Sequence, residues 1–590
     1  MKSTSRFSVR LLLSLLVALA LVASACGADD DDEGAVPEEE PAGEPADEGA
    51  GQSAGEPVPA PTTGDAEESF PPPGEASSDD EGLFAGDGGR SDEPAEETTA
   101  QSAEAQAAQE DSGAQRSQGG LFDEADDPVP PAPTPRQDGD NRFQNYGIRD
   151  FVDTVDDPLS TFALDVDTGS YSVARQWLNQ GNVPPRDSVR VEEYVNAFDY
   201  GYDDPPDALG LTIDGGPSPF DNDNYLVRIG VQSERIDDED RPDASLTFVI
   251  DTSGSMARGD RLELVKESLE ELIDELGRND TVAIVEFDDD PSIVLRPTDV
   301  DDQDDIVDAI DRLSPGGSTN VEAGLDLGYA LADDMFDDER VNRVILLSDG
   351  VANVGLIDPD GLAEMIRRDA DRGIQLLTIG VGMGNFNDVL MEQLADQGDG
   401  FYAYVDTEDE AERLFEDNLT STLVTMAIDA KIQVEFDEDV VEEYRLIGFE
   451  NRGVLDRDFR NDEVDAGEIG AGHQVSAIYE IELERGVDVG DRGELGEVRL
   501  RWEEPVTGDI TELEEDIDLR MIDPDWDDTD TSFKLAVVVA AFAEVLRDSP
   551  FADDIDLDDL EDEAEEIADD LRDRDVEDFV DLVRLADRYR

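Results

Sequence analysis

Four short apolar runs in the middle of the sequence alternate with longer amphipathic stretches. The runs occupy residues 246–250, 282–287, 344–347 and 376–381. Apolar runs of this length, bounded by turn-forming residues, are typical of buried strands, and their alternation with helical patterns predicts a parallel sheet with helices on both faces. The predicted fold class is therefore α/β, with a doubly wound and mainly parallel sheet.

The stretches between these runs have the spacing of helices. In residues 260–276 the apolar side chains recur every three or four positions and acidic residues occupy the other face, which predicts an amphipathic helix. Similar patterns predict helices at about 301–313, 321–335, 360–372, 388–396 and 408–419.

Polar side chains follow the predicted strands at the sheet edge where such folds bind ligands. Asp251, Ser253 and Ser255 come directly after the first run, Thr319 lies in a glycine-containing loop before a predicted helix, and Asp349 follows the third run. Two carboxylates and three hydroxyls are hard oxygen donors. A site with few charges and an open position suits Mg²⁺ or Mn²⁺ better than a calcium cage.

The same five residues resemble the metal-ion-dependent adhesion site of von Willebrand factor A (VWA) domains. That family has D-x-S-x-S after the first strand, a Thr in a later loop and an Asp after the fourth strand, and residues 377–382 resemble its fifth strand. The resemblance implies that the two Ser and the Thr bind the metal directly and that the two Asp bind it directly or through water. It also implies that an acidic side chain of a partner protein completes the metal shell.

The regions on either side of the central domain carry strand patterns. Residues 430–436, 475–481 and 498–502 alternate on the C-terminal side, and 225–231 do so on the N-terminal side. We therefore expect two β-sandwich-like flanks that pair into one domain, with the α/β domain inserted between them. Segments 161–198 and 444–473 also resemble the flanking regions of bacterial YfbK-like VWA lipoproteins.

The last part of the sequence predicts three helices, at 532–546, 557–571 and 576–589. The first is rich in apolar residues, but it contains Glu544 and is shorter than the roughly 20 residues that span a bilayer. We expect it to be a buried helix.

The first 26 residues have the pattern of a secretion signal. Lys2, Arg6 and Arg10 precede an apolar run at 11–25, which ends in small residues before Cys26. This ending resembles the lipobox of bacterial lipoproteins, in which the Cys is acylated. The alternative is an ordinary cleaved signal. The resemblance implies an extracytoplasmic protein anchored to the cell membrane by lipid.

Residues 27–140 are rich in Glu, Asp, Ala, Gly, Pro and Ser and hold few large apolar side chains, so we expect a disordered acidic tether. The predicted organisation is then a signal peptide at 1–26, the tether at 27–140, an N-terminal flank at 141–240, the VWA domain at 241–420, a β-rich C-terminal flank at 421–525 and a helical segment at 526–590.

The composition excludes several classes of function. The chain has 43 Lys and Arg against 153 Asp and Glu, a net charge of −110, which excludes a basic nucleic-acid groove. With one Cys and one His, an intrachain disulfide and a Cys/His zinc site are also excluded. His473 has no obvious catalytic partner and receives no role. We expect no small-molecule cofactor beyond the metal.

One alternative is a hydrolase that uses Asp165 and Asp167. Residues 167–170 spell the D-T-G-S signature of aspartic proteases, but such an enzyme needs two facing carboxylates, and no second copy is available. A D-x-D phosphatase motif is incomplete, because Gly169 replaces the expected Thr or Val. We therefore predict that the protein is not an enzyme.

Two hypotheses without catalysis remain. The favoured one is a surface-anchored module that binds a protein partner through Mg²⁺ or Mn²⁺ in adhesion or assembly. The other is a structural envelope lipoprotein whose assembly does not depend on metal.

Overall fold

The structure is a computed structural model that describes residues 136–138, 141–221, 224–259, 261–350, 359–382, 387–462, 464–489 and 492–590. Cys26, the predicted signal and nearly all of the predicted tether lie outside this part of the chain. Strand β1 (Arg136–Asp138) falls within the range predicted as tether and pairs antiparallel with β2 (Asn141–Phe143). The ring of Phe143 is buried in the same apolar cluster as Tyr402 of the central domain.

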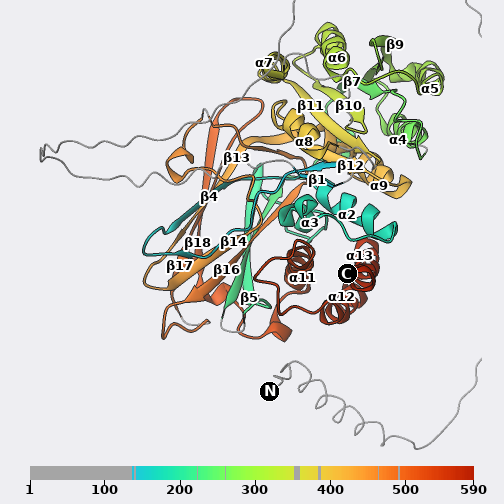
Figure 1. Cartoon of the computed structure of the whole chain (residues 1–590). Helices are drawn as coiled ribbons and strands as arrows, with labels where there is room; N and C mark the ends of the chain where they lie inside the picture. Colours follow the sequence, from blue (N-terminus) through green and yellow to red (C-terminus); the bar gives the residue numbers. More distant parts are fainter. Residues whose placement is uncertain are drawn as a thin grey trace, which may run out of the picture. The chain divides into compact units, whose positions relative to one another are not determined.

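The central domain is built on a six-stranded sheet with the order β12-β11-β10-β7-β8-β9 (Figure 1). Five strands are parallel, which confirms the predicted doubly wound α/β class, and β9 pairs antiparallel at one edge. The strands are β7 (Ala244–Asp251), β8 (Thr281–Phe287), β9 (Ser292–Asp299), β10 (Val341–Ser348), β11 (Ile374–Val381) and β12 (Tyr402–Val405). The sequence patterns predicted neither edge strand: β9 is half-exposed and contains Pro297, and β12 is only four residues long.

Helices cover both faces of this sheet, as Figure 1 shows. Phe248 and Ile250 of β7 share an apolar cluster with α4 (Arg261–Glu275) and α5 (Gln303–Asp311). Val249, between them in sequence, points to the other face and packs with α6 (Val321–Met335), α7 (Pro359–Ala370) and α8 (Asp388–Asp396). This alternation is the two-residue period of a strand that is buried on both sides.

One predicted helix is interrupted in the structure. Residues 408–419 were expected to form a single helix, whereas α9 (Glu408–Glu412) passes into a π-helical turn at Arg413–Asp417 before α10 (Leu419–Leu423). The N–H of Asn418 donates to the carbonyl of Arg413 at 3.1 Å, five residues back, which is the hydrogen-bond spacing of a π-turn.

The two flanks share both sheets of one β-sandwich. In one sheet, β13 (Thr425–Phe436) pairs with β4 (Leu159–Ala163) of the N-terminal flank and with β17 (Glu494–Glu503). In the other, β16 (Gln474–Leu483) pairs with β6 (Tyr225–Ser233). The remaining strands are β3 (Val152–Asp153), β5 (Leu209–Pro217), β14 (Val441–Ile447), β15 (Gly467–Gly470) and β18 (Ile510–Asp518). The central domain is therefore inserted between β6 and β13, which belong to different sheets of the sandwich.

A layer of helices packs on the outer face of the sheet that contains β16. Ile478 of β16 belongs to the apolar cluster of this layer, whereas its neighbours Ala477 and Tyr479 face the sandwich interior. The helices are α2 (Gly169–Asn179), α3 (Val191–Val195), α11 (Thr531–Leu546), α12 (Leu557–Leu571) and α13 (Arg574–Tyr589). The three predicted C-terminal helices thus correspond to α11, α12 and α13.

Helix α11 is buried on nearly every side, and its one acidic residue is paired. Glu544 is fully buried and accepts a hydrogen bond from Arg445 of β14 at 3.2 Å, and Arg547 also pairs with it. Within the described residues, no helix combines the length and the apolar character that crossing a membrane requires.

Candidate metal centre

The first carboxylate of the predicted site lies at the end of the central strand. Asp251 is the last residue of β7 and is fully buried. Its Oδ1 accepts the backbone N–H of Ser253 at 2.8 Å, and its Oδ2 accepts the hydroxyl of Ser348 at 2.7 Å. Because these two donors hold both oxygens, the carboxylate has one orientation at the carboxyl edge of the sheet.

Two backbone hydrogen bonds join the loop after β7 to the loop before α6. The N–H of Gly316 donates to the carbonyl of Thr252 at 2.7 Å, and the N–H of Gly254 donates to the carbonyl of Gly317 at 3.2 Å. Gly317 has a φ of +70°, a conformation that other residues rarely adopt. Although Thr319 is 68 residues from Asp251 in sequence, its loop is thereby fastened to the loop that carries the two serines.

The three hydroxyls differ in what they contact. The Oγ atoms of Ser253 and Ser255 lie 2.8 Å apart, so one donates to the other. Thr319 is fully buried, and its Oγ1 has no hydrogen-bond partner in the described part of the chain. A buried hydroxyl that makes no hydrogen bond costs about 1–3 kcal/mol, so this atom is available for a ligand.

Asp349, the second carboxylate, follows β10 and is also fully buried. It is ion-paired with Arg261, the first residue of α4. Gly382 has a φ of +73°, and a Cβ at this glycine would lie 2.2 Å from Nε of Arg261. A glycine after β11 therefore makes room for the arginine that reaches Asp349.

The electrostatics of this edge favour a cation. Burial, and then the charge of Asp349, raise the pKa of Asp251 to about 6. The five predicted residues thus supply two buried carboxylates and three hydroxyls, one of them unpaired, and this donor set fits a small divalent cation such as Mg²⁺ or Mn²⁺.

Ser348 and Arg261 were not assigned from the sequence. The available signal for Arg261 was a basic residue at the start of an amphipathic helix, directly after the Asp251 loop.

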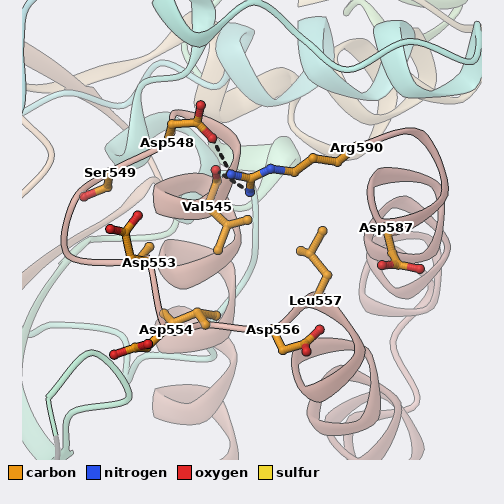
Figure 2. Close-up of a pocket in the computed structure, with 11 residues that line it drawn as sticks. Val545, Asp548, Ser549, Asp553, Asp554, Asp556, Leu557, Asp587 and Arg590 are labelled. Carbon is orange, nitrogen blue, oxygen red and sulfur yellow. Dashed lines mark hydrogen bonds and ion pairs between the residues drawn. The ribbon is translucent and has the colours of Figure 1, made fainter. Parts of the chain in front are cut away.

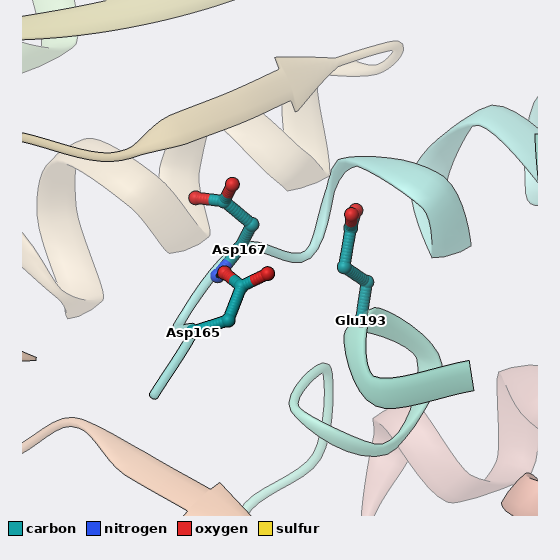
Figure 3. A group of neighbouring side chains, drawn as sticks. All are labelled: Asp165, Asp167 and Glu193. Carbon is teal, nitrogen blue, oxygen red and sulfur yellow. The ribbon is translucent and has the colours of Figure 1, made fainter. Parts of the chain in front are cut away.

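Asp165 and Asp167, the pair considered for a hydrolase, form part of a buried cluster with Glu193 (Figure 3). Arg452 donates to Asp165 at 2.8 Å and to Asp167 at 3.2 Å. The other oxygen of Asp167 accepts the N–H of Tyr402 at 2.8 Å. Figure 3 shows Glu193 facing the two aspartates from α3, and Glu193 is itself paired with Arg190. These contacts join the N-terminal flank to β12 and to the C-terminal flank.

The D-T-G-S segment has a packing explanation. Gly169 begins α2, and a Cβ there would lie 2.3 Å from the ring of Tyr402. His473 is likewise structural, because its Nδ1 accepts the N–H of Gly470 at 3.2 Å and its ring packs edge-on against Phe401. Burial lowers the pKa of His473 to about 4.

A hollow of about 470 Å³ lies between α11, α12 and α13 (Figure 2). It is lined by five aspartates together with Arg590, which pairs with Asp548 and donates to the carbonyl of Val545 at 2.8 Å. The hollow contains none of the predicted site residues.

Parts of the chain match three protein families. Residues 245–417 match the von Willebrand factor type A domain, and residues 137–228 match a family described as von Willebrand factor. Residues 421–589 match a family described as "Uncharacterized protein YfbK, C-terminal".

Individual proteins are also similar to parts of this chain. YfbK of Escherichia coli (strain K12) is 39% identical over 354 residues, which cover 58% of this chain and 62% of YfbK, so the chain spans less than two thirds of that relative. Inter-alpha-trypsin inhibitor heavy chain H3 of Homo sapiens is 29% identical over 185 residues, 30% of this chain and 19% of the human protein. A solved structure of a von Willebrand factor type A protein from Catenulispora acidiphila is 17% identical, covers 66% of this chain and 91% of its own, and has a TM-score of 0.39.

Proposed function

Because this chain is a YfbK-like protein with a von Willebrand factor type A domain, we propose that it binds a protein partner through a divalent cation at the edge of the central sheet. Domains of this type mediate protein interactions and often hold such a cation. The ligands would be Asp251, Ser253, Ser255, Thr319 and Asp349, with Mg²⁺ or Mn²⁺ as the metal. When bound, the cation would supply a Lewis-acidic position for an acidic side chain of the partner.

The observation that carries the proposal is the unpaired hydroxyl of Thr319. Thr319 is buried within a largely exposed loop that backbone hydrogen bonds fasten to the segment holding Ser253, and no group in the described chain satisfies its hydroxyl. A helix cap is the ordinary use of a threonine before a helix, but Asn320 caps α6 instead, with its Oδ1 accepting the N–H of Ala323 at 3.2 Å. A capping role therefore does not explain Thr319.

The surrounding residues hold the ligands in place. The hydroxyl of Ser348 and the N–H of Ser253 orient Asp251, and Arg261 holds Asp349. Loss of a contact that orients a ligand, as the Ser348 hydroxyl orients Asp251, typically costs about 10- to 100-fold in metal affinity, whereas Arg261 also competes with the cation through its positive charge. The chain thus contributes an oriented set of donors rather than a group that transfers protons, and we propose a binding role rather than catalysis.

The test is calorimetric titration of the full chain with MgCl₂ or MnCl₂ after treatment with chelator. We expect saturable binding that is lost in Asp251→Ala and weakened at least tenfold in Thr319→Ala. Ser318→Ala is the matched control, because Ser318 is the preceding residue of the same loop and its hydroxyl donates to Asp289 instead. Equal binding in Thr319→Ala and in the wild type would exclude the proposed site.

The partner class has its own test. We expect capture of an envelope protein by the immobilised chain to require Mg²⁺ and to be abolished by EDTA and by Asp251→Ala. The net charge of −110 should repel an acidic partner at long range, so association should become faster as salt is raised from low concentration. Capture that EDTA leaves unchanged would instead favour the structural, metal-independent lipoprotein.

We also propose that Cys26 carries a lipid that anchors the protein to the outer face of the cell membrane. The support is the order of a basic segment, an apolar run and small residues before this cysteine.

A further inference from the structure

A second group of acidic side chains lies where the central domain meets the β-sandwich. Asp399 is in the turn between α8 and β12, at the amino end of β12 and therefore at the opposite edge of the sheet from Asp251. Asp465 lies in the loop that enters β15 of the sandwich, and Glu468 is on β15 itself. We propose that Asp399, Asp465 and Glu468 form a separate binding site for Ca²⁺, which joins the two domains.

The three carboxylates are close enough to share one ion. One oxygen from each lies within 4.8 Å of the corresponding oxygen of the other two. Two ligands of the same Ca²⁺, each at about 2.4 Å from the ion, are separated by at most about 4.8 Å. The backbone of Asp399 has a φ of 46°, a left-handed conformation that a residue other than glycine adopts uncommonly.

The second observation is that these carboxylates have no partner. Glu468 is only 7% exposed, and its Oε1 makes no hydrogen bond within the described residues. The same part of the chain offers no hydrogen-bond donor and no ion pair to Asp399 or Asp465. A buried carboxylate without a donor must either take up a proton or bind a cation, and the convergence of two further carboxylates on Glu468 favours the cation.

Of the described basic side chains near the site, Lys431 is engaged elsewhere, Arg343 is partly engaged, and Arg367 acts on Asp465 through its charge without a hydrogen bond to it. Nζ of Lys431 donates to the carbonyls of Asn461 and Val464, the former at 3.2 Å. Arg343 donates through Nε to the carbonyl of Leu423 at 3.0 Å and through Nη2 to Thr425 at 2.9 Å. Its Nη1 is buried and unpaired, so an ion pair between Arg343 and Glu468 is the competing explanation that an experiment must separate.

The three carboxylates lie close enough to raise one another's pKa, and a bound cation would relieve this repulsion. Burial, and then the charge of Asp465, raise the pKa of Asp399 to about 7, while burial followed by Asp429 raises the pKa of Asp465 to about 6. Burial also raises the pKa of Glu468 well above its usual value.

The chemistry of the donors selects the ion. All three are carboxylates, with no His or Cys, which favours a hard cation. Ca²⁺ accepts six to eight oxygens in flexible geometry, and the exposed side of the site at Asp465 leaves room for water ligands. Mg²⁺ requires near-octahedral geometry at about 2.1 Å and should bind more weakly here.

The experiment uses the full chain carrying Asp251→Ala, so that the first metal centre does not contribute. After treatment with EDTA, the protein is titrated with CaCl₂ by calorimetry and its thermal unfolding is followed with and without CaCl₂. We expect one Ca²⁺ per chain and an increase in the unfolding midpoint of several degrees. Asp465→Asn, an exposed substitution, should weaken Ca²⁺ binding at least tenfold. The matched control is Asp462→Asn, an exposed acid of the same loop that pairs with Arg501, and it should bind Ca²⁺ like the parent.

Glu468→Gln separates the two explanations by the sign of its effect. If the three carboxylates await a cation, Glu468→Gln leaves the unfolding midpoint in EDTA unchanged or raises it, and it abolishes the response to CaCl₂. If Glu468 instead pairs with Arg343, the same substitution lowers the midpoint in EDTA, and CaCl₂ has no effect on the parent. The second result, or Ca²⁺ binding that Asp465→Asn and Glu468→Gln leave unchanged, would overturn the proposal.

Discussion

The guanidinium of Arg261 donates a hydrogen bond to Oδ2 of Asp349, although 88 residues separate the two in sequence. The pair joins the first turn of α4 to the end of β10 at the proposed metal centre. Both side chains are buried, and Gly382 provides the space that Arg261 occupies. The chain therefore keeps one positive charge of its own beside two buried carboxylates.

Replacing Arg261 should affect metal binding and stability in opposite directions. In Arg261→Gln we expect Mg²⁺ to bind several-fold more tightly, because a positive charge next to the cation is removed. In EDTA the variant should be less stable by about 3 kcal/mol, since Asp349 loses its buried partner. Calorimetry and chemical denaturation measure the two effects. Arg258→Gln, an exposed arginine three residues earlier, should change neither, and weaker Mg²⁺ binding in Arg261→Gln would contradict the prediction.

Arg452 should be important for stability because four carboxylates surround it. It lies 2.8 Å from Asp165, 3.2 Å from Asp167, 3.5 Å from Glu392 and 2.9 Å from Asp396. Arg452→Met leaves the buried Asp165, Asp167 and Glu392 without this partner, and we expect the free energy of unfolding to fall by about 3–5 kcal/mol.

Urea denaturation checks the Arg452 prediction against Arg457→Met, in which the replaced arginine is 75% exposed and the change should be below about 0.5 kcal/mol. Asp167→Asn should cost less than Arg452→Met, because burial and the neighbouring Asp165 raise the pKa of Asp167 well above its usual value. If Asp167→Asn proved the more damaging change, the carboxylates would have a role beyond this ion-pair cluster.

His473 should make folding sensitive to mild acid. Burial lowers its pKa from 6.5 to about 4, so the unfolded chain takes up this proton at a higher pH than the folded chain does. The contribution of neutral His473 is complete above pH 6.5 and is lost as the pH falls towards 4, by up to about 3 kcal/mol.

The measurement for His473 is the difference in unfolding free energy between the wild type and His473→Asn across this pH range. Asn keeps an acceptor for the N–H of Gly470, and the carboxylates shared by both proteins cancel in the difference. We expect the wild type to lose stability relative to the variant as the pH falls from 6.5 to 4. A difference that does not change with pH would show that His473 titrates normally in the folded protein.

Cys26 should determine where the protein is found. In Cys26→Ser the acylated residue is absent, and we expect the protein to move from the membrane fraction to the soluble extracytoplasmic fraction when cells are fractionated. Ser24→Ala, two residues earlier, is the control and should stay in the membrane fraction. Retention of Cys26→Ser in the membrane would contradict lipid anchoring.

The α/β class and the candidate metal donors could be predicted because their signals are local. Four of the five parallel strands contain an apolar run that predicts a buried strand, β12 being the exception, and each donor lies within a few residues of a strand end or before a helix. Parallel strands align their carboxyl ends, so Asp251 and Asp349 necessarily approach one another. The edge strand β9 escaped prediction because a half-exposed strand has no continuous apolar run.

The tertiary structure decided the contacts between segments that are distant in the sequence. Three such contacts join different elements. Arg261 pairs with Asp349, and Arg452 pairs with both Asp165 and Asp167. Asp399 lies close to Glu468. A local pattern specifies which face of a strand or helix is buried, but not which distant side chain it meets. For a sequence this rich in Asp and Glu, the sequence by itself determined the framework and one set of candidate donors, and only the fold decided which acids pair with arginine.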